Sequence, residues 1–291
     1  MSDGPVRYAL HDRIAVLTLD DGKANALSPA TIAALQATLD RAEREAAAVL
    51  LVGRPGRFSA GFDLNVMTGD LGGVRTLVTA GAELLLRLYL FTRPVVAACT
   101  GHALAAGALL LLAADLRLGA RGQFRIGLNE VALQLTLPVF AMELARDRLA
   151  TRLFTASVTQ ARIFDPEEAC DAGFLDLLVA PDELLDTALA HARRLAALPV
   201  WTSIKKYDLE RGTSLQRDFG ADNGVGEPLF VPRRPDADED DGYVLALVYD
   251  HARNASDFYV LAARDITGEP LAVVRIPNRV PYGFHGNWVP S

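Results

Sequence analysis

Two short stretches of small residues follow predicted strands, and both can present backbone N–H groups to a ligand. The first, residues 57–64, reads "RFSAGFDL", and Gly61 can adopt a positive φ that turns successive N–H groups toward one point. In the second, "TGHALAAGA", a predicted strand runs into a helix whose first N–H groups, from Ala105, Ala106 and Gly107, lack partners. Two converging N–H groups form an oxyanion hole, which stabilises an enolate or a tetrahedral oxyanion. Tight packing alone would also explain small residues, so their spacing leaves both interpretations open.

The elements that must position these stretches alternate between strand and helix. Strands are predicted at residues 6–10, 14–19, 48–52, 95–100, 116–119, 123–126 and 175–179, and helices at 28–46, 73–91, 103–115, 138–156, 166–172 and 181–198. The pattern predicts an α/β fold with largely parallel, buried strands. In such folds ligands bind beyond the carboxyl ends of the strands, where both stretches lie.

The composition limits the class of protein. The 291 residues are 51% hydrophobic and 22% charged, which is typical of a globular chain, and the net charge of −7 argues against nucleic acid as a partner. Two cysteines make no disulfide framework, so a reducing compartment is expected. The first residues lack a signal-peptide pattern, and the most apolar run, residues 103–114, is shorter than the roughly 20 residues of a membrane span. We therefore expect a cytoplasmic protein without a membrane partner.

Three motifs, in order, resemble the crotonase superfamily, also called enoyl-CoA hydratase/isomerase. They are "RFSAGFDLNVM", "RPVVAACTGHALAAGALLLLAADLRLGA" and "FRIGLNEVALQLTLP", and the resemblance extends over residues 5–203. It implies a spiral core of ββα repeats that binds acyl-coenzyme A thioesters as a homotrimer or hexamer. It implies no metal and no cofactor beyond the coenzyme A that the substrate carries.

The resemblance also assigns site residues. The N–H groups of Phe62 and Ala106 would hold the thioester oxygen, and Asn129 would orient the thioester or the neighbouring Glu130. Two loops would contact the coenzyme A moiety, with Lys23 and Arg57 as candidates for its phosphates, although each basic residue alone is better explained by a solvated surface role. The loop residues are Lys23, Ala24, Ala26, Ala60, Gly61, Asp63 and Leu64.

One departure from the family pattern indicates the reaction. Hydratases of this family carry two glutamates, but this chain has Leu109 at the first position and Glu130 at the second. Leucine cannot activate water, whereas one glutamate of raised pKa can move a proton between two carbons. The sequence therefore favours conversion of a 3-enoyl-CoA to the trans-2-enoyl-CoA, as in the Δ3,Δ2-enoyl-CoA isomerases that "IGLNE" resembles. An enoyl-CoA hydratase and a non-catalytic acyl-CoA-binding protein are the alternatives, and without the family match Glu130 would be read as a surface residue.

The last 86 residues have a different character, so we predict two domains, residues 1–205 and 206–291. Turn signals separate the strand-like runs "PLFVP", "GYVLALVYD", "DFYVLAAR" and "LAVVRI", which predicts an antiparallel β-meander of four or five strands. "GEPLFVPR" and "GFHGNWVP" resemble the last part of the carotenoid cleavage oxygenases, which hold iron with four histidines in a propeller. His285 would match the last histidine and Glu227 a carboxylate behind it, but the other ligand positions lie in sequence this chain lacks, so no iron site is expected.

Overall fold

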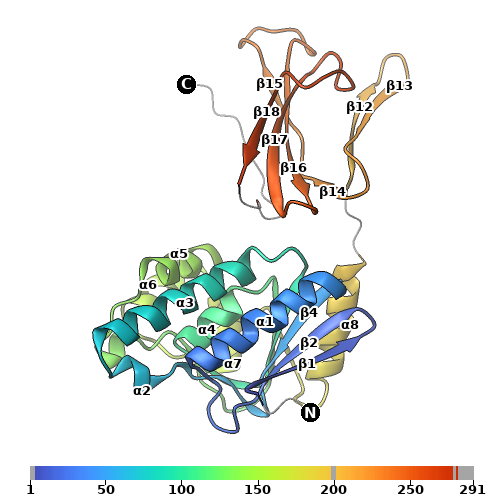
Figure 1. Cartoon of the computed structure of the whole chain (residues 1–291). Helices are drawn as coiled ribbons and strands as arrows, with labels where there is room; N and C mark the ends of the chain where they lie inside the picture. Colours follow the sequence, from blue (N-terminus) through green and yellow to red (C-terminus); the bar gives the residue numbers. More distant parts are fainter. Residues whose placement is uncertain (1–3, 198–200, 278–279, 281–291) are drawn as a thin grey trace. The chain divides into compact units, whose positions relative to one another are not determined.

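The computed structural model describes residues 4–197, 201–277 and 280 (Figure 1). The chain divides into two compact units, residues 1–197 (unit 1) and 198–291 (unit 2). The predicted boundary between residues 205 and 206 falls inside strand β12 (Ser203–Asp208) of unit 2. In the part of the chain that the structure describes, no helix is both long enough and apolar enough to cross a bilayer.

Unit 1 is built on a six-stranded sheet in which only the first pair of strands is antiparallel. The strand order is β1 (Val6–His11), β2 (Ile14–Leu19), β4 (Ala48–Val52), β7 (Val95–Cys99), β9 (Leu116–Ala120) and β11 (Leu177–Val179). Every residue of β4 and β7 is buried, which explains why these strands read as continuous apolar runs rather than as alternating patterns.

Helices cover both faces of this sheet. Because side chains alternate along a strand, Leu50 and Val96 pack against α8 (Leu184–Ala196), while Leu51 and Ala97 face the larger core under the other helices. Most of the predicted strands and helices over residues 6–120 occur close to their expected positions. The helix predicted over residues 103–115 is shorter, because Gly101–Leu104 form a strand and the helix covers Ala106–Leu112. The burial of both faces accounts for the α/β pattern of the sequence.

Successive ββα units build a second, smaller sheet beside the first. After β4, β7 and β9, the chain adds β5 (Gly56–Ser59), β8 (Gly101–Leu104) and β10 (Ile126–Gly127), which pair in the order β10-β8-β5. A third small sheet pairs β3 (Ala26–Leu27) with β6 (Gly61–Phe62). Each glycine-containing stretch therefore contains residues of a small-sheet strand and the turn after it, because β5 leads into β6 and β8 leads into α4 (Ala106–Leu112).

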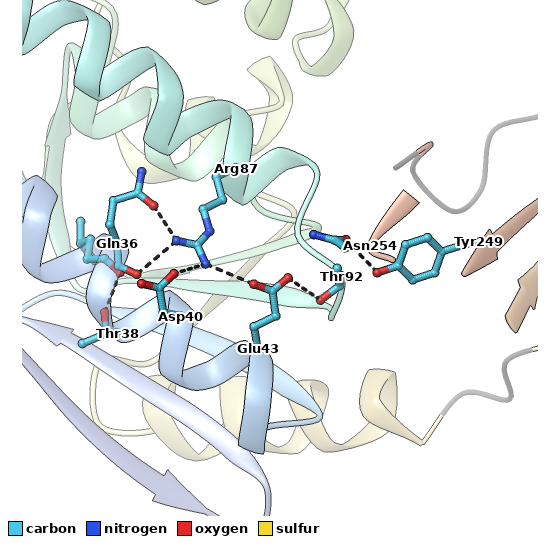
Figure 2. Close-up of polar contacts among 9 residues, drawn as sticks. Gln36, Thr38, Asp40, Glu43, Arg87, Thr92, Tyr249 and Asn254 are labelled. Carbon is cyan, nitrogen blue, oxygen red and sulfur yellow. Dashed lines mark hydrogen bonds and ion pairs between the residues drawn. The ribbon is translucent and has the colours of Figure 1, made fainter. Parts of the chain in front are cut away.

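Two long helices lie side by side over the core, α1 (Pro29–Glu45) and α3 (Leu71–Tyr89) (Figure 1). Arg87 of α3 joins them: its guanidinium contacts Asp40 at 2.7 Å and Glu43 at 3.2 Å, and donates to the Gln36 side chain at 2.7 Å (Figure 2). Thr92 donates to the second oxygen of Glu43 at 3.3 Å. This polar cluster fixes the C-terminal end of α3 on α1.

The predicted helix over residues 138–156 is wrong, because the structure has two helices there, α5 (Val139–Arg148) and α6 (Thr151–Val158). Between them Leu149 is extended with ψ of 147°, and Ala150 has a non-helical ψ of 125°. The Ala150 N–H donates to the carbonyl oxygen of Ala172, at the end of α7 (Pro166–Ala172), at 3.0 Å. A tertiary hydrogen bond therefore interrupts a segment whose local sequence is helical throughout.

Unit 2 contains an antiparallel sheet in which the nine-residue strand β16 (Gly242–Asp250) pairs with three other strands, β14, β15 and β17. The other strands are β14 (Asn223–Val225), β15 (Leu229–Pro232), β17 (Ala255–Ala262) and β18 (Ala272–Ile276), and β12 pairs separately with β13 (Thr213–Asp218). A small core lies between them, formed by Ile204, Val225, Ala246, Val248, Leu261 and Ile266. Unit 2 thus has its own hydrophobic cluster.

Candidate active site

The first glycine-containing stretch lies directly against the start of α4. Gly61 has φ of +88°, and a Cβ atom built on it would lie 2.9 Å from Ala105 Cβ and 3.0 Å from Ala106 N. Only glycine fits here, because any side chain would meet these atoms and would be strained at this φ. The two stretches that the sequence singled out are therefore in contact.

The start of α4 is an unusual turn without a side-chain cap. Ala105 precedes the helix with φ of +50°, and its N–H donates to the carbonyl oxygen of Gly127 at 3.0 Å. The N–H groups of Ala106 and Gly107, the first two residues of α4, have no acceptor within the helix. A Cβ atom on Gly107 would lie 2.3 Å from Ser59 O, so this residue also packs against the first stretch.

Contacts hold both the main chain and the side chain of Phe62. Leu27 and Phe62 are partners in the β3–β6 pair, and the next N–H, from Asp63, donates to Leu27 O at 3.3 Å. The half-buried ring of Phe62 lies against Gly81 of α3, where a Cβ atom would be 2.2 Å from Phe62 Cε1. The residue whose N–H is predicted to hold the thioester oxygen is thus fixed by two other elements, β3 and α3.

Glu130 follows the last strand of the small sheet. Gly127 of β10 pairs with Leu104 of β8, so the chain leaves the sheet next to the start of α4 and reaches Glu130 three residues later. Glu130 Oε2 and Asn129 Oδ1 are buried and have no hydrogen-bond partner within the described residues. Burial raises the pKa of the Glu130 carboxyl from its ordinary value of 4.5, although the Glu130 N–H opposes the shift. Such a carboxylate is a competent base for a carbon acid.

Leu109 belongs to the hydrophobic core rather than to a polar site. Its side chain is 1% exposed and packs within the cluster that includes Phe58, Leu84 and Ile126. The side chain at position 109 is therefore held away from any polar group by apolar neighbours.

The loop of residues 20–27 is organised by two residues that the sequence reasoning missed, Asp21 and Asn25. The Asp21 carboxylate accepts hydrogen bonds from the N–H groups of Lys23 (2.7 Å), Asn25 (2.9 Å) and Ala26 (3.1 Å). Burial would raise the pKa of Asp21, but these donors lower it overall. The "DGKAN" spacing was the available signal, since aspartate commonly accepts from the N–H groups that follow it in a turn.

Asn25 ties this loop to the first stretch. It is buried at φ of +53°, and its side-chain amide donates to the carbonyls of Leu19, Arg57 and Phe58 at 3.0–3.1 Å. Its own carbonyl accepts from Ser59 Oγ at 2.8 Å. The amide therefore satisfies three carbonyl groups that would otherwise lack this donor.

The predicted coenzyme A loops lie next to each other. The Ala60 N–H donates to Ala24 O at 3.0 Å, and Ala26 pairs with Gly61 in the β3–β6 sheet. Lys23, Ala60 and Leu64 are exposed, whereas Ala24, Ala26 and Asp63 are half-buried. Asp63 caps helix α2 (Leu64–Met67) by accepting from Asn65 N at 2.9 Å, so its carboxylate already has a structural partner.

A pocket of about 220 Å³ lies between α3 and α5. Its lining is mostly apolar, from Leu85, Leu86, Phe140 and Leu144, and Tyr89 at its edge donates to Asp147 at 2.9 Å. None of the predicted site residues lines it. It is therefore distinct from the place where Gly61 meets Ala106.

No metal centre is apparent in residues 4–197, 201–277 and 280, since no three His, Cys, Asp or Glu side chains gather there as a ligand set would. His285 lies outside the described residues. Glu227 follows β14 and lines a pocket of about 340 Å³ with Trp201 and Lys205.

In comparisons with known proteins, the two ends of the chain match different families. The enoyl-CoA hydratase/isomerase family matches residues 10–220, and the retinal pigment epithelial membrane protein (RPE65) family matches residues 187–290. An apocarotenoid-15,15'-oxygenase from Synechocystis is 41% identical over 86 residues, which are 30% of this chain and 18% of that protein. The chain thus spans less than a fifth of the length of that relative.

The longer match, over residues 10–220, covers most of unit 1 and extends into unit 2. The rat mitochondrial enoyl-CoA delta isomerase 1 is 28% identical over 215 residues, 72% of each chain. A solved enoyl-CoA hydratase/isomerase family protein from Pseudomonas syringae is 47% identical with a TM-score of 0.66, covering 67% of this chain and 85% of its own. The human mitochondrial delta3-delta2-enoyl-CoA isomerase is 29% identical with a TM-score of 0.64, covering 67% and 78%. The chain therefore belongs to the enoyl-CoA hydratase/isomerase family.

Proposed function

We propose that unit 1 shifts the double bond of a 3-enoyl-CoA to the trans-2 position, with Glu130 as the single acid and base. Glu130 takes a proton from C2, and the electron pair of that C–H bond becomes the new C2–C3 double bond of the product. The former C3–C4 π pair takes the same proton back from Glu130 at C4. One proton leaves and one returns, so no water, metal or redox partner is needed.

The observation that carries this proposal is the buried, partnerless oxygen of Glu130. A carboxylate whose pKa is raised by burial binds a proton more readily than one in water, and an oxygen without a hydrogen-bond partner is free to take it. A surface or ion-paired glutamate, the alternative reading, would have its oxygens in water or on a cation.

The N–H groups of Phe62 and Ala106 would hold the oxygen of the dienolate between the two proton transfers. The contact between Gly61 and Ala106 N supports this role, because it puts the residue before Phe62 beside the first residue of α4. Donors already in place at a developing oxyanion cost no reorganisation during the reaction, and one such donor contributes about 3 kcal/mol. Asn129 would orient the thioester or Glu130. The loop residues, from Lys23 to Ala26 and from Ala60 to Leu64, would contact the coenzyme A moiety.

An enoyl-CoA hydratase is the second candidate, favoured only by the family match. Hydration needs a group that holds and activates water, and the core position of Leu109 supplies none. The isomerase is therefore the better-supported reaction.

For unit 2 we propose a fragment of an oxygenase propeller, joined to the crotonase body of unit 1 and without iron-dependent activity. The match to only 18% of the length of the apocarotenoid-15,15'-oxygenase supports this, because a catalytic iron needs several protein ligands. The test is to add Fe²⁺ to the purified protein, remove the unbound Fe²⁺, and measure the iron that remains bound per chain by elemental analysis. Retention of one iron per chain would contradict the proposal.

The test of the isomerase is Glu130→Gln assayed with 3-hexenoyl-CoA. Glutamine keeps the size of the side chain but cannot accept the proton. We therefore expect kcat to fall by about 10³-fold or more, since general acid–base groups typically contribute about 10²- to 10⁴-fold to the rate. Glu83→Gln, an exposed position on α3, is the matched control and should keep the wild-type rate. Isomerisation by Glu130→Gln at the wild-type rate would contradict the assignment.

A further inference from the structure

Gly81 interrupts the buried stripe of α3. The buried residues of this helix are Leu77, Gly81, Leu84, Leu85 and Leu88, which recur at helical spacing, and Gly81 is the only one without a side chain. Glycine inside a helix costs about 1 kcal/mol relative to alanine. Its presence in a leucine stripe therefore calls for a steric reason.

The Phe62 ring supplies that reason. A Cβ atom on Gly81 would lie 2.2 Å from Phe62 Cε1 and 2.4 Å from Phe62 Cζ, far inside normal carbon–carbon contact distance. The ring occupies the space that a side chain at position 81 would need.

Neither side of this contact can move away freely. On the β6 side, Gly61 N donates to Ser59 Oγ at 3.2 Å, and Gly61 itself is pressed against Ala105 and Ala106. On the α3 side, the flanking leucines are buried, and the Arg87 cluster ties the helix to α1. A larger residue at position 81 must therefore displace the Phe62 ring from its present position.

We propose that Gly81 is a positioning residue, which seats the Phe62 ring and thereby sets the direction of the Phe62 N–H toward the thioester oxygen. This inference rests on the proposed function, which gives that N–H its role. Gly81 itself touches neither substrate nor reacting atoms; it acts through the ring.

Gly81→Ala tests the inference with two readouts. The first is isomerisation of 3-hexenoyl-CoA, for which we expect kcat to fall about tenfold while KM changes less than about twofold, because the change affects the transition state and not coenzyme A binding. The second is the near-ultraviolet absorbance of the enolate of bound acetoacetyl-CoA. This β-ketothioester has an acidic C2 proton, so oxyanion donors raise its enolate fraction without any turnover, and we expect that signal to fall in parallel with kcat.

The control and the rescue separate positioning from general damage. Gly4→Ala, where a Cβ atom would meet nothing within 4 Å, should leave both readouts unchanged. In a Phe62→Leu background, which keeps the N–H but removes the ring, adding Gly81→Ala should lower kcat by less than about twofold, because coupling exists only between groups in contact. The same tenfold loss in both backgrounds, or wild-type kcat and enolate signal in Gly81→Ala, would overturn the role of Gly81.

The two readouts also separate this inference from the proposed reaction. A wild-type protein that stabilises the enolate but does not isomerise 3-hexenoyl-CoA would contradict the reaction, and the enolate signal of Gly81→Ala would still decide the role of Gly81.

Discussion

Gly61 and Ala106 are in contact: the position of a Cβ atom on Gly61 is 3.0 Å from the Ala106 nitrogen. These residues are 45 positions apart in the sequence. Gly61 precedes Phe62, and the N–H groups of Phe62 and Ala106 are the two predicted oxyanion donors. The contact depends on glycine in two ways, through the space beside α4 and through the positive φ of Gly61.

Gly61→Ala should therefore be damaging for both reasons. We expect a loss of roughly 2–4 kcal/mol in the free energy of unfolding, from strain of the order of 1–3 kcal/mol plus the steric clash. Gly56→Ala is the matched control, because Gly56 has a similar φ of +76° but open space around it. Chemical denaturation of both variants measures the difference. Equal losses would show that the contact with α4 contributes nothing.

The pH dependence of stability should reveal Glu130. Its pKa is raised in the folded protein, so the folded state holds the proton more tightly than the unfolded chain does. Its contribution to stability is then fully present below the unfolded value near 4.5 and is lost as pH rises through the folded value. Relative to Glu130→Gln, the wild type should lose stability between pH 4.5 and neutrality. A difference that is constant over this range, or that grows in favour of the wild type, would contradict a buried carboxyl.

Removal of the Arg87 cluster should loosen α3. Arg87 is 26% exposed and bonds to three residues of α1, so Arg87→Met should cost about 1–2 kcal/mol of unfolding free energy, given partial solvent screening. Arg75→Met, on the exposed part of the same helix, should cost almost nothing. Thermal unfolding of the two variants provides the comparison, and equal melting temperatures would show that the cluster is not stabilising.

Asn25→Ala should destabilise the loop of residues 20–27. The substitution leaves three carbonyls without their side-chain donor, two of them in buried hydrogen bonds, which should cost roughly 2–4 kcal/mol. We also expect a higher KM for the acyl-CoA substrate, because this loop is proposed to contact coenzyme A. Asn65→Ala, which removes an exposed hydrogen bond to Asp63, is the control. Unchanged stability of Asn25→Ala would mean that other groups satisfy these carbonyls.

Much of unit 1 could be predicted because the spacing of apolar residues in its strands and helices shows which of their faces are buried. The continuous apolar runs of β4 and β7 and the helical spacing of Ile32, Leu35 and Leu39 in α1 are local signals that tertiary structure leaves in place. The break between α5 and α6 had no such signal. It depends on a hydrogen bond to Ala172, which no local pattern encodes.

The candidate site was predictable in its main-chain parts and less so in its supports. Gly61 and the small residues at the start of α4 can be recognised as site candidates from their residue types. Glu130 can be recognised from the family motif that it matches. The roles of Asn25 and Gly81 depend on what lies opposite them in space, the end of β5 and the Phe62 ring. A glycine within a leucine stripe was a visible anomaly, but its partner is 19 residues away in another element.

The most direct test of the account is the product formed by purified protein from two substrates. With 3-hexenoyl-CoA we predict steady formation of trans-2-hexenoyl-CoA, and with crotonyl-CoA no formation of the 3-hydroxy product. Hydration of crotonyl-CoA at a rate equal to or above the isomerisation, or stable binding of 3-hexenoyl-CoA without turnover, would contradict a one-glutamate isomerase.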